Sequence, residues 1–485
     1  MNRTSRTSKN IIQKFKFALL IYLFTFYTHL AFSQSSDPQD TTSTVLTGKG
    51  LTVEGMRQGN WIFYNDKNVK VKEGKYEDNR KEGIWRYYFS NGRVQKSITY
   101  KDNILDGKST EYYTFGAVKA EGKFKDGKKD GLWIQRYSNG GKEFEITYTD
   151  GKKEGDFKSY DYFGFLIIRG IYKADTTHGI WTEYHDNGRV SVKGEFAEGK
   201  KVKTWEEFYY YGRTKSLSHF VNGKPDSAWN AYYENGRKMY ERQYDNGTAI
   251  GTWKEYYDNG QLMAQVSYKN GIKDGDVVDY YRDGRLQSQG SYTNGKKTGN
   301  WRYYSYKGVL VEEGKYINDL QHDQWFTYYE DGQLKTIGSF KDGLEVGLWG
   351  IFHTDGKLMQ EEDWNYGKLW NVGDFYTLEG DTLSSGDFKD GNGEKINYYL
   401  SGNKEIVCEF KNGVPNGKWN YFYENGKLGE EGQFVNGAKE GTWTFYYNNG
   451  EKESEGQFSN SVKAGTWEYF SRRGKLIEKI NHSKK

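Results

Sequence analysis

Tryptophan recurs along this chain at a spacing of 24 residues, and that spacing constrains the fold more than any other feature. The same point of a repeat is marked by 13 of the 15 Trp residues. The spacing is unbroken from Trp61 to Trp349 and resumes from Lys395 to Trp467. Together with a displaced unit at Phe375, the chain contains 18 units. A repeat of this length indicates an array of small units, each packed against its neighbours.

Every unit carries a similar pattern, for which residues 251–275 (GTWKEYYDNGQLMAQVSYKNGIKDG) are representative. Tyr or Phe stands three residues after the Trp position in 16 of 18 units, and Gly stands seven residues after it in 16. An aromatic residue stands fifteen after it in 16 units. An Asn-Gly pair between two alternating runs predicts a β-hairpin with a type I′ turn at Asn259-Gly260.

Such a turn sets the expected pairing and the two faces of the hairpin. It pairs Tyr257 with Leu262, and Trp253 with Val266. In nine units the residue facing the Trp position is Gly, and a ring lying over a cross-strand glycine supplies the packing surface that glycine lacks. The pleat then predicts an aromatic face with Trp253, Tyr257, Leu262, Val266 and Tyr268, and a polar face with a row of tyrosines.

We therefore expect an all-β protein. Its predicted form is an elongated array of about 18 antiparallel β-hairpin repeats forming one twisted, coiled sheet. An isolated hairpin is marginal in water, so the units must stack. The regular array is expected over residues 45–359 and the C-terminal repeats over residues 396–485.

Residues 360–395 lose the period between these two regions, and Trp370 falls outside every repeat position. Such a break is a joint between two sub-arrays, a partner site or a decayed repeat. Exposed aromatic residues favour interfaces, so we predict partner-binding residues in this break and in the tyrosine row. The predicted residues are Trp364, Trp370, Glu361, Glu362 and Asp363 in the break, and Tyr232, Tyr256 and Tyr280 in the row.

Residues 1–33 are expected to be a signal peptide. Five basic residues precede the apolar run 17–32, and Ala31 and Ser33 offer small residues for cleavage. This order is typical of a secretory signal. A membrane anchor is the alternative, but the run is shorter than the ~20 apolar residues that a span needs. Residues 34–44 are polar and are expected to be a flexible leader.

Signal cleavage changes the charge balance of the chain. The segment 1–33 holds five of the 70 basic residues and none of the 66 acidic ones, so the remainder has a formal net charge of −1. Nucleic-acid binding therefore lacks electrostatic support and is not expected. The mature protein is expected in the periplasm, on the outer surface or outside the cell, with no transmembrane span.

The sequence offers little chemistry for an active site. The His residues of the mature chain show no metal-ligand spacing, and the lone Cys408 is interpreted as a packed thiol. We predict no catalytic residue, no metal and no cofactor. The enzyme alternative is a glycan hydrolase that uses the acids of 361–363.

The repeat resembles the MORN repeat in its bacterial variant form. The segments 417–426 (GKWNYFYENG) and 441–450 (GTWTFYYNNG) carry the resemblance, which covers about 430 residues. The family implies hairpin arrays that act as scaffolds for protein contacts. We therefore expect an exported, non-enzymatic interaction scaffold with a protein partner, or with a glycan or lipid headgroup. Many bacterial variants resemble a family labelled antitoxin, so a protein that neutralises a partner toxin is the alternative.

We predict signal cleavage after Ser33. N-terminal sequencing of the exported protein should begin at Gln34, because the small residues before it fit the cleavage site. An intact Met1 on a cytoplasmic product would exclude export.

Overall fold

The computed structural model describes residues 46–482. The expected signal peptide (1–33) and leader (34–44) lie outside the described residues. Every regular element of residues 46–482 is a β-strand. Within this range no helix is long and apolar enough to cross a bilayer. The predicted all-β array of antiparallel hairpins is confirmed.

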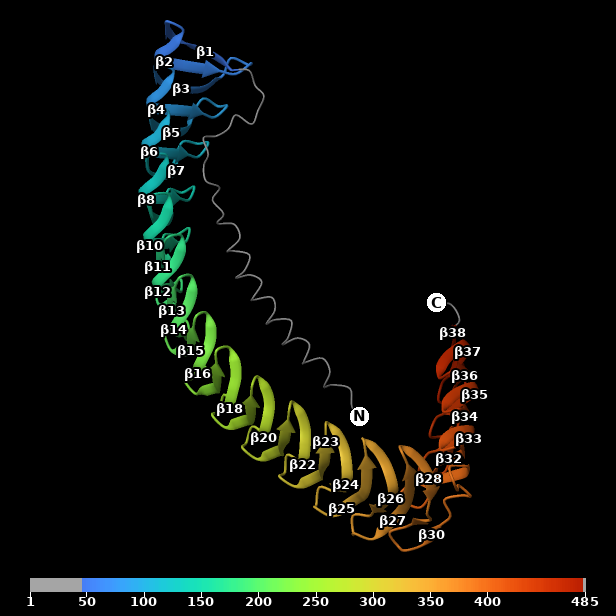
Figure 1. Cartoon of the computed structure of the whole chain (residues 1–485). Coiled ribbons are helices and arrows are strands. Elements are labelled where there is room, and N and C mark those ends of the chain that lie inside the picture. Colours follow the sequence, from blue (N-terminus) through green and yellow to red (C-terminus); the bar gives the residue numbers. More distant parts are fainter. Residues whose placement is uncertain (1–45, 483–485) are drawn as a thin grey trace. The chain divides into compact units, whose positions relative to one another are not determined.

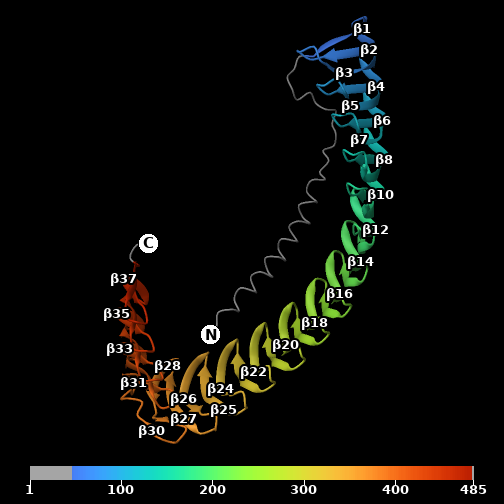
Figure 2. The ribbon, with the colours of Figure 1, turned by 180° about the vertical axis from the view of Figure 1, so that it is seen from behind.

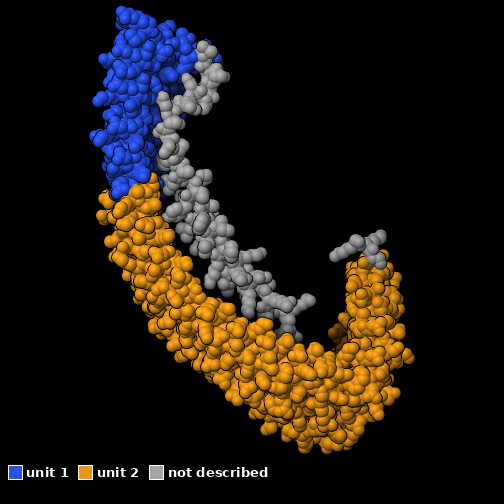
Figure 3. Space-filling model, viewed as in Figure 1, with its two compact units in different colours: residues 1–155, 159–164 blue, residues 156–158, 165–485 orange. Residues whose placement is uncertain are grey.

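The chain divides into two compact units, which Figure 3 colours separately. Within the described residues, unit 1 comprises residues 46–155 and 159–164, and unit 2 comprises residues 156–158 and 165–482. Strand β10 (Lys152–Tyr160) contains residues of both. The earlier strands belong to unit 1: β1 (Thr47–Val53), β2 (Met56–Tyr64), β3 (Lys70–Glu77), β4 (Arg80–Tyr88), β5 (Val94–Lys101), β6 (Ile104–Tyr112), β7 (Val118–Lys125), β8 (Lys128–Arg136) and β9 (Lys142–Thr149).

In unit 2 the strands follow one another in chain order, as Figures 1 and 2 show from opposite sides. From β11 to β28 each strand pairs antiparallel with the next. These strands are β11 (Leu166–Lys173), β12 (Thr176–Tyr184), β13 (Val190–Ala197), β14 (Lys200–Phe208), β15 (Thr214–Val221), β16 (Lys224–Tyr232), β17 (Lys238–Asp245), β18 (Thr248–Tyr256), β19 (Leu262–Lys269), β20 (Ile272–Tyr280), β21 (Leu286–Thr293), β22 (Lys296–Tyr304), β23 (Leu310–Ile317), β24 (Leu320–Tyr328), β25 (Leu334–Lys341), β26 (Leu344–Phe352), β27 (Leu358–Asn365) and β28 (Lys368–Val372).

The ladder is interrupted after β28, where one continuous sheet was expected. Strands β29 (Phe375–Tyr376) and β30 (Thr382–Leu383) form a two-stranded ribbon. An eight-stranded sheet follows: β31 (Gly393–Tyr398), β32 (Lys404–Lys411), β33 (Val414–Phe422), β34 (Leu428–Val435), β35 (Ala438–Tyr446), β36 (Lys452–Ser459), β37 (Val462–Phe470) and β38 (Leu476–Asn481). Residues 373–392 consist of turns and two-residue strands, which are too short to continue the ladder.

The two turns of a repeat differ in type, and the expected assignment is wrong. At Asn259-Gly260 only Gly260 has a positive φ, of 90°. Its N–H donates to the carbonyl oxygen of Tyr257 (2.9 Å), which closes a three-residue loop. The type I′ turn lies instead at Asn270-Gly271, where both residues have positive φ (51° and 81°).

The three-residue loop also shifts the pairing from the one expected. Trp253 pairs with Val266 as predicted, but Tyr256 rather than Tyr257 pairs with Leu262. The extra residue on the second strand forms a β-bulge. Leu262 therefore shares the face of Tyr256 rather than the aromatic face, and Tyr257 belongs to the loop.

One sheet face holds the predicted aromatic core. The side chains of Trp85, Trp443 and Trp467 are fully buried. In unit 1 the rings of Tyr76 and Trp85 meet edge to face with centroids 4.9 Å apart. Phe458 and Trp467 meet in the same way in unit 2, at 5.0 Å. Edge-to-face contact is favourable because the positive ring edge faces the negative π-surface.

Most Trp rings at the repeat position cover a glycine of the preceding repeat. Trp229 and Trp419 instead pair with Ser218 and Cys408. Gly314 pairs with Trp301 on one side and with Trp325 on the other. A Cβ added to Gly314 would lie 2.2 Å from the Trp325 ring, so the later ring leans over it. The Trp325 Nε1–H also donates to the carbonyl of Lys315 (3.1 Å). The expectation that the ring of the same hairpin covers the glycine is therefore wrong. The same contact recurs at Gly74, Gly122, Gly170, Gly194, Gly290, Gly338, Gly432 and Gly456.

In two places the following repeat has no Trp at its repeat position, and the residue that would lie beneath that ring is not glycine. Ser109 stands at a Trp position and pairs with Ile98, and Val277 at another pairs with Val266. Ile98 and Ser109 are each only 2% exposed. A small residue at the Trp position is thus matched by an aliphatic side chain, which fills the volume that a ring fills elsewhere.

Gly314→Ala should lower the free energy of unfolding by about 2 kcal/mol or more, because the new methyl group overlaps the Trp325 ring. Urea denaturation measures the loss. Gly373→Ala is the matched control, since a Cβ there meets no atom closer than 3.5 Å.

The same contact can be tested by exchanging its two partners. The double variant Gly314→Val/Trp325→Val copies the natural Val266–Val277 pair. Its loss of stability should be smaller than the sum of the two single losses. Strictly additive losses would mean that ring and glycine are not coupled.

Candidate functional site

The acids of the predicted site in residues 360–395 are bonded within the chain. The Glu362 carboxylate lies 3.2 Å from the Lys395 ammonium, and the two side chains are only 14% and 12% exposed. The indole N–H of Trp364 donates to the other oxygen of Glu362 (3.2 Å). Asp363 accepts a hydrogen bond from the Asn371 side chain (3.1 Å). The carboxylates of Glu362 and Asp363 thus hold the irregular segment together.

Glu361 and Trp370 complete the five residues predicted in this segment. Glu361 is exposed, whereas Trp370 is half-buried. The Trp370 carbonyl accepts the N–H of Gly391 (2.8 Å), and its ring lies 3.0 Å from the point where a Gly391 Cβ would stand. The five residues lie together on β27 and β28, but the side chains of four of them make contacts inside the segment. Their role in partner binding stays a prediction.

The rest of the irregular segment is also packed. Phe375 and Phe388 are buried. The buried Gln360 amide donates to the Ser385 hydroxyl (2.8 Å). A ring nitrogen of His353, which is 1% exposed, lies 2.6 Å from the Tyr376 carbonyl oxygen. The segment is therefore packed, and its interpretation as a joint, a partner site or a decayed repeat stays a prediction.

Several tyrosines of the predicted row bond to glutamates of the preceding repeat. The Tyr256 hydroxyl donates to Glu241 (2.8 Å), and the Tyr328 hydroxyl donates in the same way to Glu313 (2.9 Å). Burial, followed by the hydrogen bond to Glu241, raises the pKa of Tyr256 to about 12. This hydroxyl is therefore an internal donor at neutral pH.

The other two predicted tyrosines, Tyr232 and Tyr280, are half-buried at the equivalent position. Their backbone carbonyls accept hydrogen bonds from the hydroxyls of Tyr209 (2.8 Å) and Tyr257 (2.9 Å). The structure thus places all three predicted tyrosines at equivalent positions of successive hairpins. Their binding of a partner stays a prediction.

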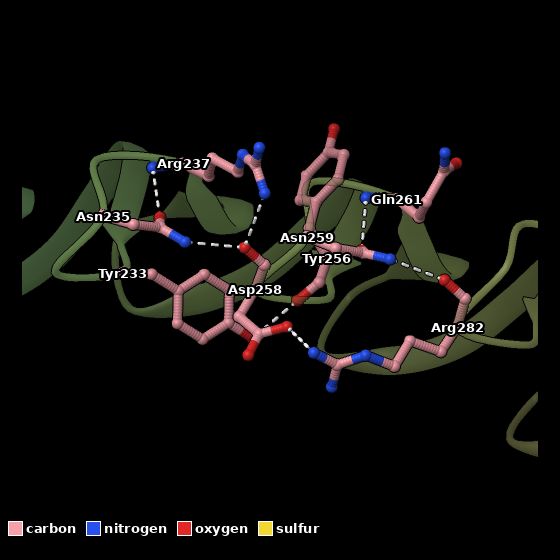
Figure 4. Close-up of polar contacts among 8 residues, drawn as sticks. All are labelled: Tyr233, Asn235, Arg237, Tyr256, Asp258, Asn259, Gln261 and Arg282. Atoms are coloured by element: carbon pink, nitrogen blue, oxygen red, sulfur yellow. Dashed lines mark hydrogen bonds and ion pairs between the residues drawn. The ribbon is translucent and has the colours of Figure 1, made fainter.

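The hairpin loops are tied together by side chains that reach from one repeat to the next (Figure 4). The Tyr233 hydroxyl donates to the Tyr256 carbonyl (2.7 Å), and the Asn235 amide donates to the Asp258 carbonyl (2.7 Å). The Arg237 guanidinium donates to the same Asp258 oxygen (3.3 Å). The loops therefore form a fixed edge rather than independent tips.

This hydrogen-bond ladder recurs along both units. Its tyrosine donors reach the carbonyl 23 residues further along the chain. In unit 1 they are Tyr113 and Tyr137, and in unit 2 they are Tyr209, Tyr233, Tyr257, Tyr281, Tyr329, Tyr399, Tyr423 and Tyr447.

Several tips on this loop edge carry exposed aromatic side chains. Phe163 is 83% exposed in unit 1, and Tyr211 is 72% exposed in unit 2. These tips are absent from the sequence prediction. Their signal is an aromatic residue at a loop position that usually holds Asp or Asn, as at Asp258-Asn259. The exposed tip residues are Phe115, Tyr162 and Phe163 in unit 1, and Tyr210, Tyr211 and Tyr306 in unit 2.

Hairpin units whose rings and loops bond to the next unit define a β-hairpin repeat scaffold. The chain is a MORN-repeat protein. The family described as MORN repeat variant matches residues 81–102, 105–126, 177–198, 250–270, 273–294, 324–342, 415–436 and 439–460.

No curated protein matches the chain in sequence. Solved structures that it resembles include the TcdB2-TccC3-Cdc42 complex, at 11% identity over 90% of this chain and 29% of that one, with a TM-score of 0.12. A pore structure of the Photorhabdus luminescens Tc holotoxin shows 9% identity over 89% of this chain and 28% of that one, with a TM-score of 0.12. The chain thus spans less than a third of these proteins, and the likeness carries no argument about function.

Within residues 46–482, no group of three or more His, Cys, Asp or Glu could hold a metal ion. Burial raises the pKa of the Cys408 thiol to about 12, which keeps it protonated and unreactive at neutral pH.

Tyr256 should make stability sensitive to alkaline pH. The unfolded chain ionises this tyrosine near its ordinary pKa of about 10, whereas the folded chain holds the pKa at about 12. Its contribution is therefore complete below about pH 10 and is lost as the pH rises to about 12. The unfolding free energy, measured with urea, should fall more steeply over this range in the wild type than in Tyr256→Phe.

Glu241→Gln provides the control for this prediction. The amide removes the negative charge beside the hydroxyl and should bring the pH dependence closer to that of Tyr256→Phe. The same pH dependence in all three proteins would contradict the assigned role of the Tyr256–Glu241 pair.

Proposed function

We propose that this protein is an exported, non-enzymatic scaffold that binds a protein partner through its loop edge, in the cell envelope or outside the cell. The single observation that carries the proposal is the set of exposed aromatic side chains on loops that hydrogen bonds hold in place.

Exposed Tyr and Phe side chains are strong candidates for interface anchors. Aromatic residues are enriched at interfaces because they bury a large area with few rotatable bonds. The Tyr210 and Tyr211 rings, 5.3 Å apart, are exposed at the tip of one loop. The Tyr209 hydroxyl and the Arg213 guanidinium of this loop donate to the Tyr232 and Glu234 carbonyls of the next repeat. A surface held in this way loses little entropy when it binds a partner.

Export is supported by the basic, apolar and small-residue order of residues 1–33. A binding scaffold also needs none of the catalytic, metal or cofactor residues that we do not expect in this chain. The alternative is that the protein neutralises a partner toxin. In that case the bound partner should lose a toxic activity in the complex.

The double variant Tyr210→Asn/Tyr211→Asn should lose partner capture at least tenfold, because each exposed ring acts as an anchor. The measurement is crosslinking and pull-down from the envelope fraction with the full mature chain as bait, followed by binding of the purified partner. Glu234→Ser is the matched control, since Glu234 occupies the Tyr210 position in the next repeat. It should leave capture unchanged.

Equal capture by the wild type and the double variant would exclude this loop as the binding edge. Circular dichroism of both variants should match that of the wild type, because the substituted rings are exposed.

A further inference from the structure

A pocket of about 290 Å³ opens on the aromatic face of unit 1. It lies over strands β5 to β9. Trp133, Phe144 and Tyr148 contribute aromatic walls, and Lys129 and Glu111 contribute charged groups. The volume is close to the lower limit of known ligand sites, so the pocket fits a small molecule or a single side chain.

The pocket exists because Ala120 is small. Ala120 pairs with Glu111 on one side and with Gln135 on the other. The equivalent residue of the preceding repeat is Lys96, and that of the following repeat is Phe144. The Ala120 methyl group therefore leaves a depression between the longer side chains of Lys96 and Phe144. The Trp133 ring also lines this depression.

The charges that line the pocket favour an anion. The lining contains Lys96, Lys119 and Lys129 against the single acid Glu111. Lys96 and Glu111 form an ion pair at 3.2 Å, so part of the positive charge is compensated inside the site. The lining still holds more basic than acidic side chains, and the Lys129 ammonium lies among aromatic side chains, where electrostatic attraction is stronger than in water.

Lys129 is placed for such a contact. Its ammonium lies 4.3 Å from the centroid of the Trp133 ring and 5.1 Å from that of the Tyr148 ring. Burial lowers the pKa of Lys129, an effect that Glu111 opposes and that Lys96 and Lys153 reinforce. An anion beside this ammonium would offset the cost of burying its charge.

We propose that this pocket binds a small carboxylate with an apolar body, the carboxylate against Lys129 and the body against Trp133 and Phe144. The chemistry fits a free aromatic or branched carboxylic acid. It also fits the carboxyl terminus of a peptide that ends in an apolar residue.

The test uses benzoate as the probe and the full mature chain, with ligand-observed NMR titration as the measurement. Benzoate should bind, and benzamide, which has the same shape without the charge, should bind at least tenfold more weakly. Lys129→Met should weaken benzoate binding at least tenfold, and Ala120→Leu should abolish it by filling the pocket.

Lys201→Met is the matched control. Lys201 occupies the repeat position of Lys129, and its ammonium lies 4.0 Å from the Trp205 ring, but it belongs to unit 2. This variant should bind benzoate like the wild type. Circular dichroism of each variant confirms that the fold is retained.

Three outcomes would overturn the proposal: no benzoate binding by the wild type, equal binding of benzamide, or unchanged benzoate binding by Lys129→Met. A peptide that ends in Phe with a free carboxyl group distinguishes a protein terminus from a free small acid as the natural ligand. Its amidated form is the control and should bind more weakly, because it lacks the carboxylate. Tighter binding of the free-acid peptide than of benzoate assigns the site to a protein terminus, and weaker binding assigns it to a small molecule.

Discussion

The contact between a tryptophan ring and the glycine of the preceding repeat is the interaction on which the array depends. Trp325 lies over Gly314 and donates its indole N–H to Lys315, so packing and hydrogen bonding join the same two strands. Because the ring comes from the next hairpin, no repeat completes its own core. Stability therefore arises at the junctions between repeats, as in other quasi-one-dimensional proteins.

This contact fixes the strand register, and the register in turn positions the loops. Where successive units are in phase, a side chain such as Tyr233 reaches the carbonyl of Tyr256 in the next unit. A shift by one residue would turn each side chain to the other face and break the ladder. The ordered loop edge is thus a consequence of core packing on the strands, and the exposed tips such as Tyr211 depend on it.

The period and the identity of the core residues were readable from the sequence because both depend only on spacing and residue type. The turn types were not, because Asn-Gly fits two loops: at 270–271 both residues adopt positive φ, whereas at 259–260 only the glycine does. Which of the two neighbouring tryptophans covers each glycine was also predicted wrongly. Gly314 has a tryptophan paired on each side, and only side-chain direction decides between them. The exposed tip residues were missed because they lie in the loops, where neither the strand alternation nor the break in the period marks them.

The irregular segment shows what replaces the ring–glycine contact where the period fails. The residue opposite the last regular tryptophan, Trp349, is Glu362 rather than glycine, and it pairs with Lys395 at the first position of the resumed repeat. A largely buried ion pair adds little net stability compared with apolar packing, but leaving either charge unpaired is costly. The Glu362–Lys395 pair therefore destabilises any chain conformation that buries one of the two charges without the other. The Glu362–Lys395 ion pair thus takes the place of the ring–glycine contact where the ladder ends and starts again.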